Sequence, residues 1–179
     1  MTRALLLTPG ASANRDHASL VAVEEAIAPV PCRRIDLPRP GPKPDRVLEV
    51  IRHEAAVLAE ETGLALDRIA LGGRSMGGRM CSMAVAAGLP ALGLALVSYP
   101  LHPPGKPDQL RVAHLPDLYV PCLFVSGTRD AFATPGELEA ATATIPGAVT
   151  HVWVDGGDHG LRGRDAVVAA AVRDWLAGL

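Results

Sequence analysis

The chain has 179 residues, a length typical of one domain with a full hydrophobic core. Hydrophobic residues make up 49% and charged residues 20%, which fits a globular protein and not an intrinsically disordered one. The net charge of −2 and the 3% of aromatic residues argue against a nucleic-acid-binding protein, which needs clustered cations and stacking rings. We therefore expect a single domain spanning residues 1–179.

The apolar segments are too short to place the chain in a membrane. The run at residues 4–7 is shorter than the core of a signal peptide, and no run approaches the roughly 18 residues that cross a bilayer. Three cysteines, Cys32, Cys81 and Cys122, are odd in number and widely spaced, so they predict neither a disulfide framework nor a metal site. These features predict a cytoplasmic protein without membrane contact.

Short apolar runs alternate with helical patterns from the N-terminus onward. The expected strands lie at residues 4–7, 30–37, 69–71, 92–98, 120–126 and 151–154. The expected helices lie at residues 20–27, 45–63, 79–87, 134–145 and 164–176, and a stiff proline-rich loop lies at 38–44. Strands that are apolar at every position are typical of a parallel sheet covered by helices on both faces.

Several helix ends carry capping signals. Asn14 or Asp16 is expected to cap the first helix, and Asp45 is expected to cap the second, which ends at Gly63. Residues 134–137, with the sequence TPGE, have the pattern of a capping box with proline at the first helical position. These signals support the helical assignments.

The segment 72–78, with the sequence GGRSMGG, lies between the third strand and a helix. Its glycines at positions 73 and 77 are typical of a sharp strand-to-helix turn, in which Ser75 takes strained backbone angles while the neighbouring backbone passes closely. Such a turn exposes the serine hydroxyl at the carboxyl end of a strand, beside the N–H groups of a helix N-terminus. The setting favours Ser75 as a nucleophile over an ordinary turn.

Other chemically suitable side chains follow later strands. Asp130 follows the fifth strand and His159 the sixth, and ligands of such sheets bind beyond the carboxyl ends of the strands. A serine nucleophile needs a base within reach and a third group that fixes the tautomer of the imidazole. Asp155 and Asp158 compete with Asp130 for this third role, but Asp158 is adjacent to His159 and adjacent side chains rarely face each other. The order Ser75, Asp130, His159 is the one expected on an α/β-hydrolase sheet.

With these residues the chain resembles the α/β-hydrolase superfamily, and within it the small dienelactone-hydrolase-like and Tex30/KANSL3-like members. The resemblance covers essentially the whole chain and rests on the segments 73–78, 99–106, 127–130 and 158–159. It implies a minimal α/β-hydrolase fold, a three-layer sandwich with a six-stranded parallel sheet in the order 2-1-3-4-5-6. The two leading strands of the full hydrolase sheet and a lid domain are expected to be missing.

The resemblance also implies site roles. Ser75 would be the nucleophile, His159 the general base and acid, and Asp130 the carboxylate that orients His159. The N–H groups of Met76 and Ala11 would form the oxyanion hole. Two departures stand out: the first loop lacks the His-Gly pair common in hydrolases, and dienelactone hydrolase itself has cysteine as its nucleophile.

Further residues could contact the substrate. Gly10 is expected to border the site, and His102 has two open interpretations, a substrate contact or a hydrogen bond that structures its loop. His17 also occupies a loop that could face the site. Arg74 could contact an acidic substrate, although a solvated arginine is the commoner case. The histidines outside such loops are interpreted as surface residues: His53 and His151.

We therefore expect a serine hydrolase that cleaves a carboxylic ester or thioester of a small-molecule substrate through an acyl-enzyme. No cofactor and no metal are expected, because the chain has neither a phosphate-binding Gly-Lys-Ser/Thr loop nor a Gly-x-Gly-x-x-Gly after its first strand, and no metal-ligand spacing. The alternative is a catalytically silent hydrolase-fold domain used for protein or ligand binding. The acyl group, the leaving group and the oligomeric state do not follow from the sequence.

Overall fold

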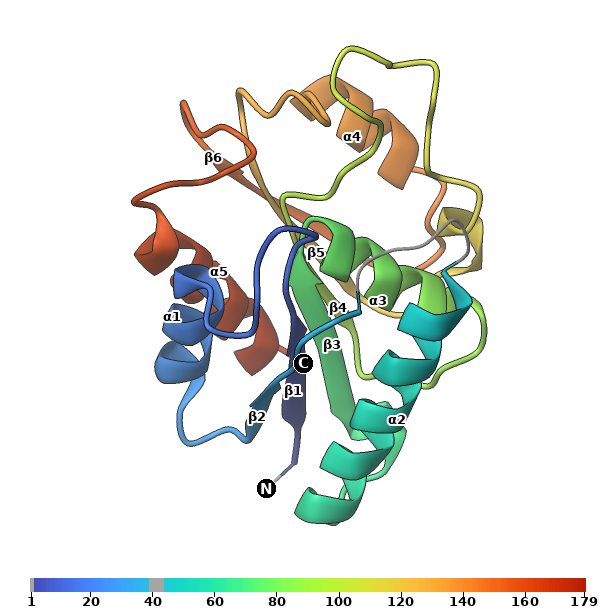
Figure 1. Cartoon of the computed structure of the whole chain (residues 1–179), viewed down its shortest axis with the longest axis vertical. Helices are drawn as coiled ribbons and strands as arrows, with labels where there is room; N and C mark the ends of the chain where they lie inside the picture. The colour runs from blue at the N-terminus through green and yellow to red at the C-terminus, as the bar shows by residue number, and fades with distance from the viewer. Residues whose placement is uncertain (1, 39–43) are drawn as a thin grey trace.

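The computed structural model describes residues 2–38 and 44–179, and in this part of the chain six parallel strands form one sheet with the order β2-β1-β3-β4-β5-β6, as expected. Helices cover both faces of the sheet, so the fold is a three-layer α/β sandwich (Figure 1). The strands are β1 (Ala4–Thr8), β2 (Cys32–Arg34), β3 (Ile69–Arg74), β4 (Leu94–Val97), β5 (Cys122–Gly127) and β6 (Val149–Val154). The helices are α1 (Ala18–Ile27), α2 (Asp45–Thr62), α3 (Met76–Ala86), α4 (Pro135–Thr142) and α5 (Asp165–Ala177), with the 3-10 turns η1 (Leu66–Arg68) and η2 (Leu115–Asp117).

Alternate residues of the central strands face opposite layers of helices. In β1, Ala4 and Leu6 belong to the core beneath α2 and α3, whereas Leu5 and Leu7 belong to the core beneath α1 and α5. Both faces are therefore apolar, which explains why the strands read as unbroken apolar runs in the sequence. All six strands run away from the end of the molecule where the N-terminus lies, toward the loops at the opposite end (Figure 1).

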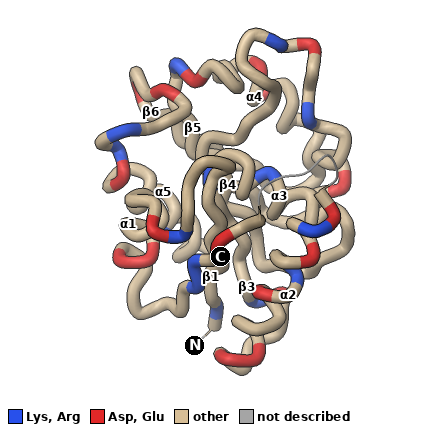
Figure 2. Tube along the Cα trace, viewed as in Figure 1, with Lys and Arg blue, Asp and Glu red and all other residues tan. Residues whose placement is uncertain are grey.

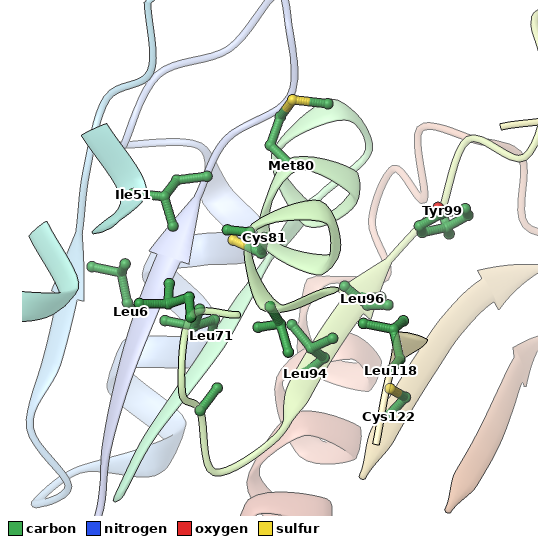
Figure 3. Packing of buried hydrophobic residues seen from close by; sticks show 14 of the residues in the cluster. Leu6, Ile51, Leu71, Met80, Cys81, Leu94, Leu96, Tyr99, Leu118 and Cys122 are labelled. Atoms are coloured by element: carbon green, nitrogen blue, oxygen red, sulfur yellow. The ribbon is translucent and has the colours of Figure 1, made fainter. Parts of the chain in front are cut away.

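The core beneath α3 holds the start of that helix in place. Met80 and Cys81 of α3 pack with Leu71 of β3 and with Leu94 and Leu96 of β4 (Figure 3). These side chains are at most 3% exposed, and full burial of a leucine side chain contributes about 1.5–3 kcal/mol. The packing thus fixes α3 against the sheet, and with it the turn that joins β3 to α3.

The cap of α1 differs from the prediction. The Nδ1 atom of His17 accepts a hydrogen bond from the N–H of Ser19 at 3.3 Å, so His17 is the cap, and the expectation of Asn14 or Asp16 is wrong. The side chain of Asn14 instead accepts the N–H of Asp16 at 2.9 Å and shapes the turn before the helix. Asn and Asp lead the statistical preference for this position, which is why the sequence favoured the neighbours of His17.

Of the other predicted caps and end signals, the one at the start of α2 is wrong and two are confirmed. Asp45 is the first residue of α2 and makes no capping hydrogen bond, so its predicted role as cap is wrong; its carboxylate lies in the first turn, where the helix dipole favours a negative charge. The left-handed end at Gly63 is confirmed, with φ of 68°. The capping box between Thr134 and Glu137 is confirmed as well. Of the expected proline-rich loop, residues 39–43 lie outside the described residues.

Some elements are shorter than predicted. β2 pairs only with β1 and spans three residues instead of the predicted 30–37; at its start, Pro31 has no N–H to donate to the strand ladder. α4 ends at Thr142, three residues early, and β4 is shorter than 92–98. The segment between β4 and β5 holds only the turn η2 where larger hydrolases are expected to have a lid domain.

His151 is not the surface residue that the sequence suggested. It lies within β6, which starts at Val149, and its ring stacks between Phe124 and Trp153, with centroids 5.4 and 5.2 Å away. Its Nε2 atom lies 3.0 Å from the hydroxyl of Thr142 in α4. Because α4 covers this face of β6, His151 is half-buried.

Acidic and basic residues are mixed over the molecule. In Figure 2, segments of both signs occur throughout the view, in keeping with 17 Lys and Arg against 19 Asp and Glu. Among the described helices, none has the length and apolar character that crossing a membrane would need. Against this mixed background, a cluster of side chains with one sign of charge would be a distinct feature.

A polar network joins α3 to the segment that follows β4. The Nε2 atom of His114 lies 2.8 Å from the hydroxyl of Ser82 and 3.3 Å from that of Tyr99. The Ser82 hydroxyl donates to the carbonyl of Arg79 at 2.8 Å, so its oxygen can accept an N–H from His114. Burial, assisted by the nearby Arg79 cation, lowers the pKa of His114 to about 4. The ring is therefore neutral in the folded protein near pH 7.

We expect the protein to lose stability through His114 as the pH falls from about 6.5 to about 4. In this window the unfolded chain binds a proton on the ring and the folded chain does not, so acid favours unfolding; above the ordinary pKa of 6.5 neither state is protonated and the effect vanishes. The urea midpoint of His114→Gln should fall less steeply over this window than that of the wild type. Equal slopes for the two proteins would contradict the expectation.

Candidate active site

The loops beyond the carboxyl ends of the strands surround a cavity with a volume of about 560 Å³. Its walls come from five segments: the loop after β1, the β3–α3 turn with the first turn of α3, and the segments that follow β4, β5 and β6. The lining residues, in chain order, are Gly10, Ala11, Ser12, Ala13, His17, Arg74, Ser75, Met76, Arg79, Pro100, Arg111, Phe132 and His159.

Ser75 connects β3 directly to α3 in a strained backbone conformation, with φ of 50° and ψ of −120°. A residue with a Cβ in such a region costs about 1–3 kcal/mol and persists only where the surroundings hold it. Here the N–H of Ser75 donates to Val97 of β4 at 2.8 Å, and its carbonyl accepts the N–H of Arg79 at 3.1 Å. The neighbouring strand and the helix therefore impose the turn that carries the serine into the cavity wall.

The glycines around Ser75 are required by the close approach of β1. A Cβ on Gly77 would lie less than 3.0 Å from Thr8 and from the carbonyl oxygen of Pro9. A Cβ on Gly73 would likewise clash with Thr8 and lie 2.9 Å from the amide nitrogen of Gly78. Any side chain at these positions would push α3 away from β1, which explains the Gly-x-Ser-x-Gly pattern in physical terms.

The structure brings together the three residues that the sequence singled out. Ser75 Oγ lies 2.8 Å from Nε2 of His159, and Nδ1 of His159 lies 2.9 and 2.8 Å from the two carboxylate oxygens of Asp130. The Asp130 side chain is fully buried and also accepts the N–H of Phe132 at 2.8 Å. A carboxylate only accepts, so Nδ1 of His159 carries a proton, and Nε2 of the neutral ring is left to accept the Ser75 hydroxyl.

Backbone contacts hold the two loops that carry Asp130 and His159 side by side. The N–H of Arg129 donates to the carbonyl of Gly157 at 2.8 Å. Gly127 lies so close to Gly157 that a Cβ on it would overlap the Gly157 carbonyl. The absence of side chains at this crossing lets the loops after β5 and β6 approach within hydrogen-bond distance, which sets the separation of the carboxylate and the imidazole.

Arg74 also holds the loop that carries His159. Its guanidinium donates from Nη2 to the carbonyl oxygens of His159 and Gly160 at 2.7 and 2.8 Å, and burial lowers its pKa from the ordinary value. The interpretation of Arg74 as a solvated arginine is therefore wrong. The ring of Phe132 stacks on the His159 imidazole with centroids 3.9 Å apart. Three contacts thus position the imidazole: Arg74 binds the backbone carbonyl, Phe132 stacks on the ring and Asp130 binds Nδ1.

The backbone N–H groups of Met76 and Ala11 lie at the cavity without an acceptor among the described residues. Met76 is the first residue of α3, where an N–H has no partner within the helix. Both residues line the cavity. Gly10 also lines it, and a Cβ on Gly10 would lie 3.5 Å from Cβ of Ser75, so the first loop passes directly beside the serine.

The two loop histidines have different surroundings. His102 does not line the cavity: its ring is 6% exposed, with Nδ1 2.8 Å from the carbonyl oxygen of Pro103 and Nε2 3.5 Å from Glu137 of α4. Its expected substrate contact is therefore not found, and the alternative of a loop-structuring role fits. His17 does line the cavity, and burial together with the Arg74 cation lowers its pKa.

Sequence reasoning missed Arg79, Arg111 and Phe132, which also line the cavity. Arg79 follows Ser75 by four residues in a predicted helix, so helical spacing could have placed it on the same face. Arg111 and Phe132 come from irregular segments, and their direction depends on the three-dimensional path of the chain. In residues 2–38 and 44–179, no three His, Cys, Asp or Glu side chains form a group that could hold a metal ion.

Comparisons with known proteins agree with this fold. A family model described as an alpha/beta hydrolase domain matches residues 1–171. The structure of DcsB with its substrate analogue is similar, with a TM-score of 0.80 and 15% identity over 98% of this chain and 90% of the other. Est1E from Butyrivibrio proteoclasticus has a TM-score of 0.74 and 17% identity over 99% and 89%. A malate-bound thermophilic esterase from Thermogutta terrifontis has a TM-score of 0.74 and 21% identity over 98% and 90%.

Proposed function

Because the chain belongs to the alpha/beta hydrolase domain family, we propose that it is a serine hydrolase that cleaves a carboxylic ester or thioester through an acyl-enzyme. The observation that carries the proposal is the unbroken chain of hydrogen bonds from Ser75 through His159 to the buried carboxylate of Asp130. A hydroxyl, an imidazole and an orienting carboxylate in this order can activate a serine for attack on a carbonyl carbon.

In the proposed reaction, Nε2 of His159 takes the hydroxyl proton as Ser75 Oγ attacks the carbonyl carbon. The N–H of Met76, and as second donor that of Ala11, stabilise the oxyanion; one such donor contributes about a hundredfold to a thousandfold in kcat. His159 then gives the proton to the leaving alkoxide or thiolate, and the acyl group remains on Ser75. A water molecule repeats the sequence and releases the acid, while Asp130 stabilises the imidazolium at each stage.

The esterases among the similar structures support an ester as the substrate. The proposal includes a small-molecule substrate and a cytoplasmic location. The narrower placement among dienelactone-hydrolase-like or Tex30/KANSL3-like proteins also belongs to the proposal, and it rests on the segments 73–78, 99–106, 127–130 and 158–159. The other candidate function, a silent domain that binds a protein or ligand, is separated from catalysis by the experiment below.

The folded protein should react with a fluorophosphonate probe, because an activated serine attacks phosphorus and the adduct stays on Oγ. Mass spectrometry of the digested protein should place the adduct on Ser75. Ser75→Ala and heat-denatured wild type should both remain unlabelled, since the first lacks the hydroxyl and the second lacks the imidazole beside it. If the folded wild type does not react, the serine hydrolase proposal is wrong, and the catalytically silent binding domain becomes the better hypothesis.

A further inference from the structure

The charged side chains that line the cavity are arginines. Arg74, Arg79 and Arg111 line it, and no Asp or Glu occurs among the described residues of the lining. The whole chain carries a net charge of −2, and charges of both signs are mixed over the molecule (Figure 2). The excess of cations is therefore local to the place where Ser75 and His159 meet.

Arg74 is already engaged with the carbonyls of the His159 loop, whereas Arg79 and Arg111 have no partner of opposite charge in the part of the chain that the structure describes. None of the ion pairs within residues 2–38 and 44–179 includes Arg79 or Arg111. The Nε atom of Arg79 is buried and has no hydrogen-bond acceptor among the described residues. Burial lowers the pKa of Arg79, and the Arg111 cation acts in the same direction.

A half-buried cation without an anion is costly, because it has lost part of its hydration and gained no partner in return. The surroundings of Arg79 do not lower this cost. The neighbouring groups on the segment after β4 are the Arg111 cation, the neutral ring of His114 and the phenol of Tyr99. A charge kept in this position at the wall of a cavity is suited to a ligand that brings the missing anion.

The position of Arg79 relative to the nucleophile is set by α3. Its N–H donates to the carbonyl of Ser75 at 3.1 Å, so Arg79 lies one helical turn after the nucleophile. Arg111 reaches the cavity from the segment after β4. Its backbone is held at both ends, since its N–H donates to Leu101 at 2.8 Å and its carbonyl accepts the Tyr99 hydroxyl at 3.3 Å.

We propose that Arg79 and Arg111 form a subsite for an anionic group, a carboxylate or a phosphate, carried by the substrate one helical turn from the bond that Ser75 attacks. The planar guanidinium matches the oxygen pair of either anion, and two cations converge on it. The inference rests on the proposed serine hydrolase function. It narrows the substrate class to esters or thioesters of molecules with a second, ionised acid group, such as monoesters of dicarboxylic acids.

The test compares substrates that differ only in charge. For the wild type, kcat/KM for monomethyl adipate should exceed that for dimethyl adipate by about tenfold to a hundredfold, the value of one or two hydrogen bonds between charged groups. Methyl 5-phosphonopentanoate, with the same four methylenes as the adipate, provides the phosphate-like arm, and the better of the two anions identifies the group that the subsite prefers. Methyl 6-aminohexanoate, a cation, should be a poorer substrate than the neutral diester.

Variants of Arg79 then test whether the preference for the anionic substrate depends on this arginine. In Arg79→Met the ratio of kcat/KM between monomethyl and dimethyl adipate should fall to about one, and Arg79→Lys should restore part of it because the charge returns. Arg68→Met, an exposed arginine on η1, is the matched control and should keep the wild-type ratio. A wild type that prefers the neutral diester, or a ratio unchanged in Arg79→Met, would overturn the subsite and leave the hydrolase proposal standing.

A binding measurement separates the two proposals. Calorimetry with the Ser75→Ala protein should detect monomethyl adipate, which this variant does not hydrolyse, and the further substitution Arg79→Met should weaken the binding by about tenfold or more. If no ester is turned over but this binding is found, the subsite stands and the serine hydrolase proposal falls. If neither monomethyl adipate nor the phosphonate binds, the subsite is rejected.

Discussion

Alanine in place of Ser75 or of His159 is expected to lower kcat about ten-thousandfold or more, and the double variant should lose no more than either single variant. The reason is the 2.8 Å hydrogen bond between Oγ and Nε2, because neither group can act alone: the hydroxyl needs a proton acceptor, and the imidazole has nothing else to deprotonate. The measurement is kcat of the purified proteins with a short-chain p-nitrophenyl ester.

The comparison requires that each variant is folded. Alanine keeps the Cβ of Ser75, whereas His159→Ala removes a side chain that is only 20% exposed. Urea unfolding of every variant should therefore accompany the kinetics. The alternative of two independent contributions makes a different prediction, in which the losses of the single variants multiply in the double variant. That outcome, with all variants folded, would refute the assignment of Ser75 and His159 to one catalytic unit.

Alanine at Gly77 is expected to lower the free energy of unfolding by about 3–5 kcal/mol or to prevent folding. The added methyl group would lie less than 3.0 Å from Thr8 and from the carbonyl of Pro9, both at the end of β1, and this strand is held between two others in the sheet. Neither the strand nor α3 can move away without opening the core beneath the helix. Urea unfolding followed by circular dichroism measures the loss.

Gly136 in α4 provides the matched control for Gly77. A Cβ on Gly136 would meet no atom within 4 Å, and its helical backbone suits alanine. Gly136→Ala should therefore raise the free energy of unfolding by about 0.4–1 kcal/mol, through the smaller entropy of the unfolded chain. If Gly77→Ala were as stable as the wild type, close packing of β1 against α3 would not be the reason for glycine at position 77.

The parallel sheet covered on both faces and the meeting of Ser75, Asp130 and His159 could be predicted because each depends on a signal with a direct physical cause, whereas the strand order was implied by the resemblance to the α/β-hydrolase superfamily. Strands covered on both faces must be apolar throughout, and a serine in a strained turn needs glycines around it. The carboxyl ends of parallel strands then converge without further information. The catalytic roles of these residues remain proposals until the labelling and kinetic experiments are done.

The direction of side chains in irregular segments could not be predicted. His102 and Arg111 lie in the same loop-rich segment after β4, yet Arg111 lines the cavity and His102 turns toward α4. Arg74 was misjudged for a related reason: its partners are backbone carbonyls of a distant loop, and a carbonyl acceptor leaves no trace in residue type. The cap of α1 could not be predicted because three candidate residues, Asn14, Asp16 and His17, lie within four positions. Statistical preference does not identify the one that caps the helix.

The backbone strain at Ser75 has a consequence for laboratory evolution. Glycine is the one residue that adopts φ of 50° and ψ of −120° without a Cβ penalty, so Ser75→Gly would relieve strain that alanine retains. A selection for heat resistance alone would then reward the loss of the proposed nucleophile. Libraries built on this chain should therefore be screened for hydrolysis and thermal tolerance together, with position 75 held constant.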